Sequence, residues 1–120
     1  MLPKINRIKK QKDFEIIFKK GVSFKNSLFV LKFIKNSLNK TRVSFIVSNK
    51  ISKKATVRNK IRRRLSEIVK KEINNIKGSL DIVFISLPGI EKKDFLELKD
   101  ALNNLLIKAK IIKEDFLKKE

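Results

Sequence analysis

The chain has 120 residues, of which 31 are Lys or Arg and 12 are Asp or Glu, giving a formal net charge of +19. It contains no Cys, His, Trp or Tyr, which excludes disulfides, zinc fingers, thiol nucleophiles and imidazole acid–base catalysis. Self-repulsion at this charge opposes compaction, so we expect the natural partner to be a polyanion, in the first place nucleic acid.

The length and composition predict a single domain over residues 1–120. A hydrophobic fraction of 42% is enough for one modest core and leaves no room for a second. The N-terminus lacks the apolar stretch of a signal peptide, and no apolar run approaches the length of a membrane span. We therefore expect a cytoplasmic location and no membrane partner.

The N-terminal part is predicted to contain an arm and a short helix. Residues 1–10 are basic with isolated apolar positions and are expected to run as an extended arm over the domain. A helix is predicted at residues 13–20, because lysines fill its last turn and Gly21 suits its C-terminal end. Phe14 and Phe18 share one face of this helix, and the pattern alone favours ordinary core packing for both.

Four stretches have the composition of β-strands. They are rich in β-branched and aromatic residues and are separated by polar turns or by the central helix described below. Lys32 is the one charged residue within the apolar second stretch, and side-chain alternation places it opposite Phe29, Leu31 and Phe33. The predicted strands are residues 22–25, 28–34, 42–48 and 80–85.

A further helix is predicted near the C-terminus. Asp94 followed by Glu97 forms a variant of the capping box that begins many helices. Residues 107–118 alternate apolar pairs with lysines and are expected to extend this helix or add another, without a functional signal. The buried stripe of the helix is expected to comprise Phe95, Leu98, Leu102 and Leu105.

The stretch 48–71 predicts a central helix with one apolar and one basic face. Its apolar residues recur at steps of four, four and three, which is helical periodicity. Its basic residues stack in pairs four apart, and no carboxylate interrupts residues 48–66. Like charges at this spacing repel by a few tenths of a kcal/mol per pair, so we expect an external anion to compensate them. The apolar stripe consists of Val57, Ile61, Leu65 and Ile68.

A basic helix face is often only solvated surface, and that interpretation remains the alternative here. Arginine, however, has the planar fork that pairs with phosphate, and Asn59 is unfavourable within a helix unless it makes a contact. The connector 49–54 is basic and precedes a helix N-terminus, where free amide groups favour anions, although it could also be a solvated loop. The candidate RNA-binding residues are Lys53, Lys54, Arg58, Asn59, Lys60, Arg62 and Arg63.

Residues 53–63, KKATVRNKIRR, resemble the signature of the protein subunit of bacterial ribonuclease P: a basic helix that opens with Arg-Asn, then a basic residue, an aliphatic residue and two more basic residues. Residues 7–21 are similar to the N-terminal segment of that family. With the length and the preceding strand, the resemblance covers most of the chain. Two positions depart from it: Ser66 replaces a usual Arg, and Lys32 replaces a common Tyr.

The order of the elements, a helix, two or three strands, a helix, a strand and a helix, indicates an α/β sandwich. The fold class expected is therefore α/β, in the α+β sense: a two-layer sandwich of helices on a mixed sheet of about four strands, as in some ribosomal proteins. A right-handed strand–helix–strand crossover is the general expectation. The resemblance instead implies a left-handed one.

The resemblance also implies a function: the chain would assist a catalytic RNA in removing the 5′ leader of precursor tRNA. The partners implied are the ribonuclease P RNA and precursor tRNA, with no protein partner. No catalytic residue and no cofactor are expected in the protein itself, and Mg²⁺ would be bound through the RNA. The resemblance implies a leader-binding cleft formed by Arg7, Lys10, Phe14, Phe18 and Lys32.

Two other classes of protein remain open as interpretations of this sequence. A ribosomal protein or another small structural RNA-binding protein shares the size, the charge and sometimes the fold. A protein-only metal nuclease would need paired metal-binding carboxylates, whereas the carboxylates of this sequence are scattered.

Overall fold

The computed structural model describes residues 2–112. Four strands form one sheet in the order β1-β2-β4-β3. The pairs β1–β2 and β2–β4 are antiparallel, whereas β3 and β4 are parallel and are connected through helix α2. The expected mixed four-stranded sheet is thus confirmed, and the hand of the β3–α2–β4 crossover stays a prediction. The strands are β1 (Val22–Lys25), β2 (Phe29–Lys35), β3 (Arg42–Ile46) and β4 (Leu80–Ser86).

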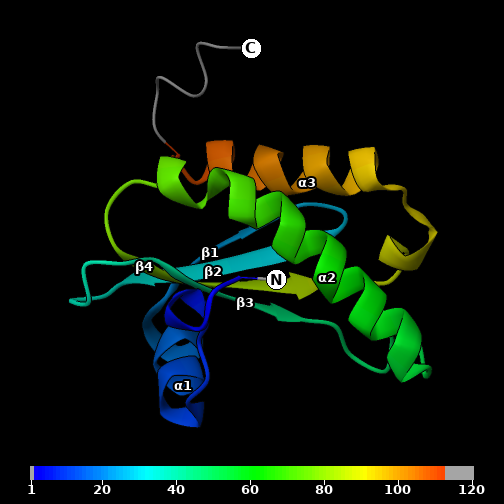
Figure 1. Cartoon of the computed structure of the whole chain (residues 1–120), viewed down its shortest axis with the longest axis horizontal. Helices are drawn as coiled ribbons and strands as arrows, with labels where there is room; N and C mark the ends of the chain where they lie inside the picture. The colour runs from blue at the N-terminus through cyan, green and yellow to red at the C-terminus, as the bar shows by residue number, and fades with distance from the viewer. Residues whose placement is uncertain (1, 113–120) are drawn as a thin grey trace.

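Helices cover both faces of this sheet (Figure 1). Helices α2 (Ala55–Glu72) and α3 (Phe95–Lys108) lie on one face, and α1 (Gln11–Lys20) lies on the other. No helix within residues 2–112 has the length and apolar character needed to cross a membrane. Short 3-10 helices occur at Lys4–Asn6, Ile73–Asn75 and Ile90–Lys92.

The main core lies between the sheet and helices α2 and α3. Alternation along the strands directs Phe29 and Leu31 of β2 and Phe84 of β4 into it, and all three are almost fully buried. The rings of Phe29 and Phe84 meet edge to face with centroids 6.0 Å apart, a favourable geometry for aromatic pairs. The predicted stripe of α2 is confirmed: Ile61, Leu65 and Ile68 are buried, and Val57 packs at the border of the core.

A smaller apolar cluster fixes α1 to the opposite face of the sheet. Ile17 of α1 and Val83 of β4 are fully buried there, and Ile8 of the N-terminal arm joins them. The helix ends at Gly21, as predicted, but with φ −69° and ψ 150° rather than in a left-handed conformation. Glycine is needed because a Cβ atom would collide with the Ile17 carbonyl oxygen.

Helix α3 confirms the predicted capping box. Asp94 accepts a hydrogen bond from the Glu97 amide at 2.8 Å, and the Glu97 side chain accepts one from the Asp94 amide at 3.4 Å. Phe95 was wrongly included in the buried stripe, since it is 38% exposed, while Leu106 is buried. Periodicity shows which face of a helix is buried. It does not show how far along the helix the elements that cover this face extend, and Phe95 lies at the first position of α3.

The C-terminal part of the described chain continues beyond α3 without another helix. The helix ends at Lys108, and Ile111 and Ile112 are both buried in the main core. Ile112 forms a bridge with Ile76, which closes the chain over the end of α2. The prediction for residues 107–118 therefore holds only for the first two residues, and residues 113–118 lie outside the described part.

Candidate nucleic-acid interface

The basic helix face consists of Arg58, Asn59, Lys60, Arg62 and Arg63 of α2. Asn59, Lys60 and Arg63 are exposed, whereas Arg58 and Arg62 are half-buried at the flanks of the helix. Because neither Arg62 nor Arg63 belongs to the apolar stripe, the sequence predicts that both face solvent, which is correct for Arg63 and wrong for Arg62. Arg62 lies on the flank of α2 that meets the end of β3, where it reaches a backbone carbonyl.

Neutral acceptors hold the two half-buried arginines of this face. Arg62 donates from Nη1 to Asn59 Oδ1 at 2.6 Å and from Nη2 to the Val47 carbonyl at 3.1 Å. Arg58 donates from Nη1 to the Ser52 carbonyl at 2.9 Å. These hydrogen bonds restrict the guanidinium groups without cancelling their charge.

Asn59 makes the kind of contact that its position within a helix predicted. The sequence predicts a hydrogen bond of Asn59 with RNA, with Arg58 or with Arg63. Within the protein its partner is instead Arg62, three residues further along, and a contact with RNA stays a prediction. Residues three apart on a helix are neighbours, so the bond fits the geometry of α2. Asn59 therefore orients one guanidinium group of the basic helix face.

No ion pair compensates the positive charge of the basic helix face within the described residues. The ion pairs found among residues 2–112 are Arg42–Asp13, Arg42–Asp81 and Lys93–Glu97, and none of them involves this face. Lys53 and Lys54 are exposed just before the helix, and Lys54 is its N-cap residue without a side-chain cap. The connector, the open helix N-terminus and the basic helix face thus form one continuous positive region.

A second candidate surface lies on the opposite face of the sheet, beside α1. Phe18 is 41% exposed, and the Lys32 Nζ atom lies 5.5 Å from the centroid of its ring. This distance is within the range of a cation–π interaction. We call this pair the Phe18–Lys32 surface, and its position confirms the predicted side-chain alternation along β2.

The other residues of the predicted cleft are distributed around α1 and the N-terminal arm. Phe14 is half-buried and packs against the apolar cluster under α1, so core packing accounts for part of its surface. Lys10 is exposed at the N-cap of α1. Arg7 lies elsewhere, because its backbone pairs with Val43 at the edge of β3 and its side chain lines a cavity together with Arg62.

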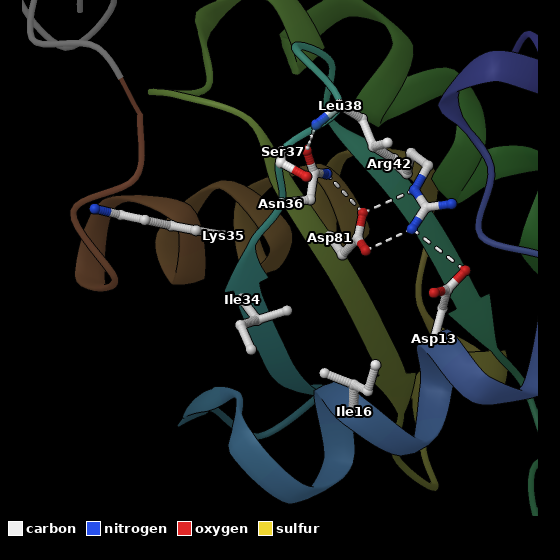
Figure 2. A pocket seen from close by; sticks show the side chains of 9 residues that line it. All are labelled: Asp13, Ile16, Ile34, Lys35, Asn36, Ser37, Leu38, Arg42 and Asp81. Carbon is white, nitrogen blue, oxygen red and sulfur yellow. Dashed lines mark hydrogen bonds and ion pairs between the residues drawn. The ribbon is translucent and has the colours of Figure 1, made fainter.

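A buried ion pair at the start of β3 fixes α1 relative to the sheet (Figure 2). Arg42 donates from Nε and Nη2 to the two carboxylate oxygens of Asp81 at 2.8 and 2.6 Å, and its Nη2 lies 3.4 Å from Asp13 of α1. Asn36 donates to Asp81 at 2.7 Å. The hydrogen bonds to Asp81 raise the pKa of Arg42 further above its ordinary value.

This cluster, which we call the Arg42–Asp81 clamp, lines a cavity of about 430 Å³ between α1 and the β2–β3 turn. The sequence interpretation missed it. The available signal was Asp81, the one charged residue in an otherwise apolar strand, because a buried carboxylate needs a partner.

Comparison with known proteins identifies this chain. Residues 2–110 match the family model for ribonuclease P. The chain belongs to the ribonuclease P protein family. It is 35% identical over 107 residues to the ribonuclease P protein component of Alkaliphilus metalliredigens, covering 89% of this chain and 96% of the relative. The corresponding protein of Streptococcus pneumoniae is 40% identical over 112 residues, covering 90% and 87%.

Solved ribonuclease P proteins share the fold. The protein of Staphylococcus aureus superposes with a TM-score of 0.83 at 33% identity and covers 90% of this chain and 98% of its own. That of Thermotoga maritima gives a TM-score of 0.76 at 36% identity, with coverage of 83% and 94%. The chain is thus an RNA-binding protein of tRNA processing and a component of an endoribonuclease.

Proposed function

We propose that this ribonuclease P protein binds the catalytic RNA subunit through the basic helix face and binds the 5′ leader of precursor tRNA through the Phe18–Lys32 surface. The observation that carries the proposal is the basic helix face: its two half-buried arginines, Arg58 and Arg62, are oriented by neutral acceptors, and its basic residues lack carboxylate partners within residues 2–112. Guanidinium groups in this state are suited to phosphate, which they contact through paired hydrogen bonds.

The geometry of α2 favours contacts with the sugar–phosphate backbone over contacts with bases. Lys60 and Arg63 extend from the exposed side of α2, and Lys53 and Lys54 precede its open N-terminus. Lysines and helix N-termini contact phosphate oxygens, which carry no sequence information directly. The protein would then recognise the fold of the RNA subunit more than its sequence.

The leader would bind by stacking one base on Phe18. The cation–π contact with Lys32 contributes about 0.5–1 kcal/mol at an exposed site, whereas a base stacked on an aromatic ring contributes about 1–3 kcal/mol. A base can therefore displace the Lys32 ammonium group from the ring. The released ammonium group would pair with a leader phosphate, and the exposed Lys10 would add positive charge at the other end of α1.

The chemical step is assigned to the RNA subunit, with Mg²⁺ bound by the RNA and no cofactor bound by the protein alone. The protein would contribute by neutralising phosphates and by holding the leader, so that less Mg²⁺ is needed to fold and load the RNA. No side chain of the protein is proposed as a catalytic residue. The cytoplasmic location and the absence of a protein partner stay predictions.

Reconstitution tests the proposal. The protein is added to a bacterial ribonuclease P RNA, and leader removal from precursor tRNA is measured at a magnesium concentration that barely supports the RNA alone. We expect strong stimulation by the protein and no cleavage by the protein without the RNA. No stimulation would leave a structural RNA-binding role as the better account, and cleavage without RNA would indicate a protein-only nuclease.

A further inference from the structure

A cavity of about 170 Å³ lies where the N-terminal arm runs beside the edge of β3 and meets the flank of α2. Its lining includes the side chains of Arg7 and Arg62 and two serines, Ser44 of β3 and Ser66 of α2. One water molecule needs only about 10–15 Å³. The cavity therefore has room for a polyatomic anion.

Both guanidinium groups keep most of their hydrogen-bond donors available. Arg7 donates from Nε to the Leu2 carbonyl at 2.7 Å, and Arg62 uses Nη1 and Nη2 for one hydrogen bond each. A guanidinium group has five N–H donors, so within residues 2–112 about four remain unpaired on Arg7 and about three on Arg62. Serine hydroxyls in the same lining add donors that can rotate toward an anion.

The two arginines belong to different elements, and each is held in place by its own element. Arg7 is fixed because its backbone pairs with Val43, while Leu2 and Ile8 on either side of it are buried in the two apolar clusters. Arg62 is fixed because it belongs to α2 and bonds the end of β3. An anion entering the cavity would therefore find its donors already oriented, which lowers the entropic cost of binding.

The lining of this cavity contains no carboxylate among the residues that the structure describes, so two positive charges share it without internal compensation. The cavity beside Arg42 is different, because Asp13 and Asp81 line it together with the arginine. Like charges brought together in a half-buried site repel each other, and an anion between them removes this repulsion. The charge of the cavity thus favours an anionic ligand.

We infer that this cavity binds one phosphodiester group of the RNA subunit. Arg7 and Arg62 donate to its non-bridging oxygens, and the hydroxyls of Ser44 and Ser66 complete the site. The inference rests on the proposed function for the identity of the RNA. It extends the RNA interface from the basic helix face around the edge of β3, and it gives Arg7 a place in that interface.

Filling the cavity tests this inference without changing the charge of the protein. Ser66→Leu introduces an apolar side chain into the cavity, and Ser27→Leu makes the same change at an exposed position at the opposite edge of the sheet. Affinity for a bacterial ribonuclease P RNA is measured over a series of salt concentrations. Ser66→Leu should weaken binding about tenfold and reduce the slope of log affinity against log salt by roughly 0.7–0.9, the value for one phosphate. Ser27→Leu should match the parent.

A parental salt slope for a folded Ser66→Leu protein would overturn the inference. Melting midpoints establish whether the variant folds. If Ser66→Leu does not fold, Ser44→Val decides instead, because it fills the cavity from β3 with a residue that suits a strand. The same reduction of the slope is expected for it, and an unchanged slope would again count against the phosphate site.

A separate measurement distinguishes failure of this inference from failure of the proposed function. Inorganic phosphate is titrated into the protein while the Nε–H resonances of Arg7 and Arg62 are followed by NMR. Both resonances should shift in the parent and in Ser27→Leu, but not in Ser66→Leu. This result would support the cavity even if the ribonuclease P RNA did not bind, whereas equal shifts in all three proteins would reject it.

Discussion

Arg42 and Arg62 are both half-buried beside β3, but they are surrounded by opposite chemistry. Arg42 is held by the carboxylates of Asp81 and Asp13 at 2.6–3.4 Å. Arg62 is held by an amide oxygen and a backbone carbonyl, both of them neutral. The first arrangement cancels the charge of the arginine inside the fold, and the second one preserves it for an external partner.

The difference separates arginines that stabilise the fold from arginines that are available for binding. A carboxylate partner turns the guanidinium group into a fixed cross-link, and removing one member leaves an uncompensated half-buried charge. A neutral acceptor contributes only an ordinary hydrogen bond and leaves the electrostatic potential of the surface unchanged. Substitutions around Arg42 should therefore change the stability of the fold, whereas substitutions around Arg62 should mainly change RNA binding.

The largest effect is expected from Asp81→Asn, which removes the charge that pairs with Arg42. The free energy of unfolding should fall by about 3 kcal/mol, because Arg42 is left half-buried without its main partner. Urea titration measures this loss. RNA affinity per folded molecule should stay at the parental value, and an unchanged urea midpoint would show that Arg42 does not need its carboxylate.

Phe18→Leu tests the Phe18–Lys32 surface, which lies beside α1, the helix that the Arg42–Asp81 clamp fixes to the sheet. Loss of base stacking should weaken precursor tRNA binding by roughly five- to a hundredfold, equivalent to about 1–3 kcal/mol. Binding of mature tRNA, which has no leader, should not change. Leu96→Ala, at an exposed position of α3 on the other face, is the control. Equal losses for both tRNA forms together with a lower melting midpoint would return Phe18 to a packing role.

Arg62→Ala and Arg63→Ala compare a hydrogen-bonded arginine with a free one on the same helix. Each should lower the slope of log RNA affinity against log salt by roughly one, because each removes one phosphate contact. Only Arg62→Ala should also reduce stability, by about 1 kcal/mol, since it alone loses two intramolecular hydrogen bonds. Salt titrations and thermal melts of both variants check this, and identical melting midpoints would contradict the distinction.

The smallest effect is expected from Asn59→Ala, which removes no charge and one hydrogen bond to Arg62. The loss of orientation should lower leader removal several-fold at limiting magnesium, in line with about 0.5–1.5 kcal/mol for one hydrogen bond. High magnesium should largely restore the activity. If mutant and parent were equally active at every magnesium concentration, Asn59 would be an ordinary exposed residue.

The sequence by itself determined the local elements and the chemistry of α2. The period of Ile61, Leu65 and Ile68 requires one buried helix face, whatever the rest of the chain does, and therefore keeps the basic residues between them out of the core. The capping box at Asp94 was readable because its partner lies three residues away. Such patterns involve residues three or four positions apart along the chain, so the sequence alone shows which residues interact.

Only the tertiary structure decided which distant residues meet. The Arg42–Asp81 pair spans 39 positions, and no periodic pattern connects an Arg at the start of β3 with an Asp in β4. Arg7 was expected beside Phe18, yet pairing of the arm with the edge of β3 places it beside Arg62 and Ser66 instead. Contacts of this kind depend on strand order and on which sheet edge or face a segment covers, and these are set by packing of the whole core rather than by local spacing.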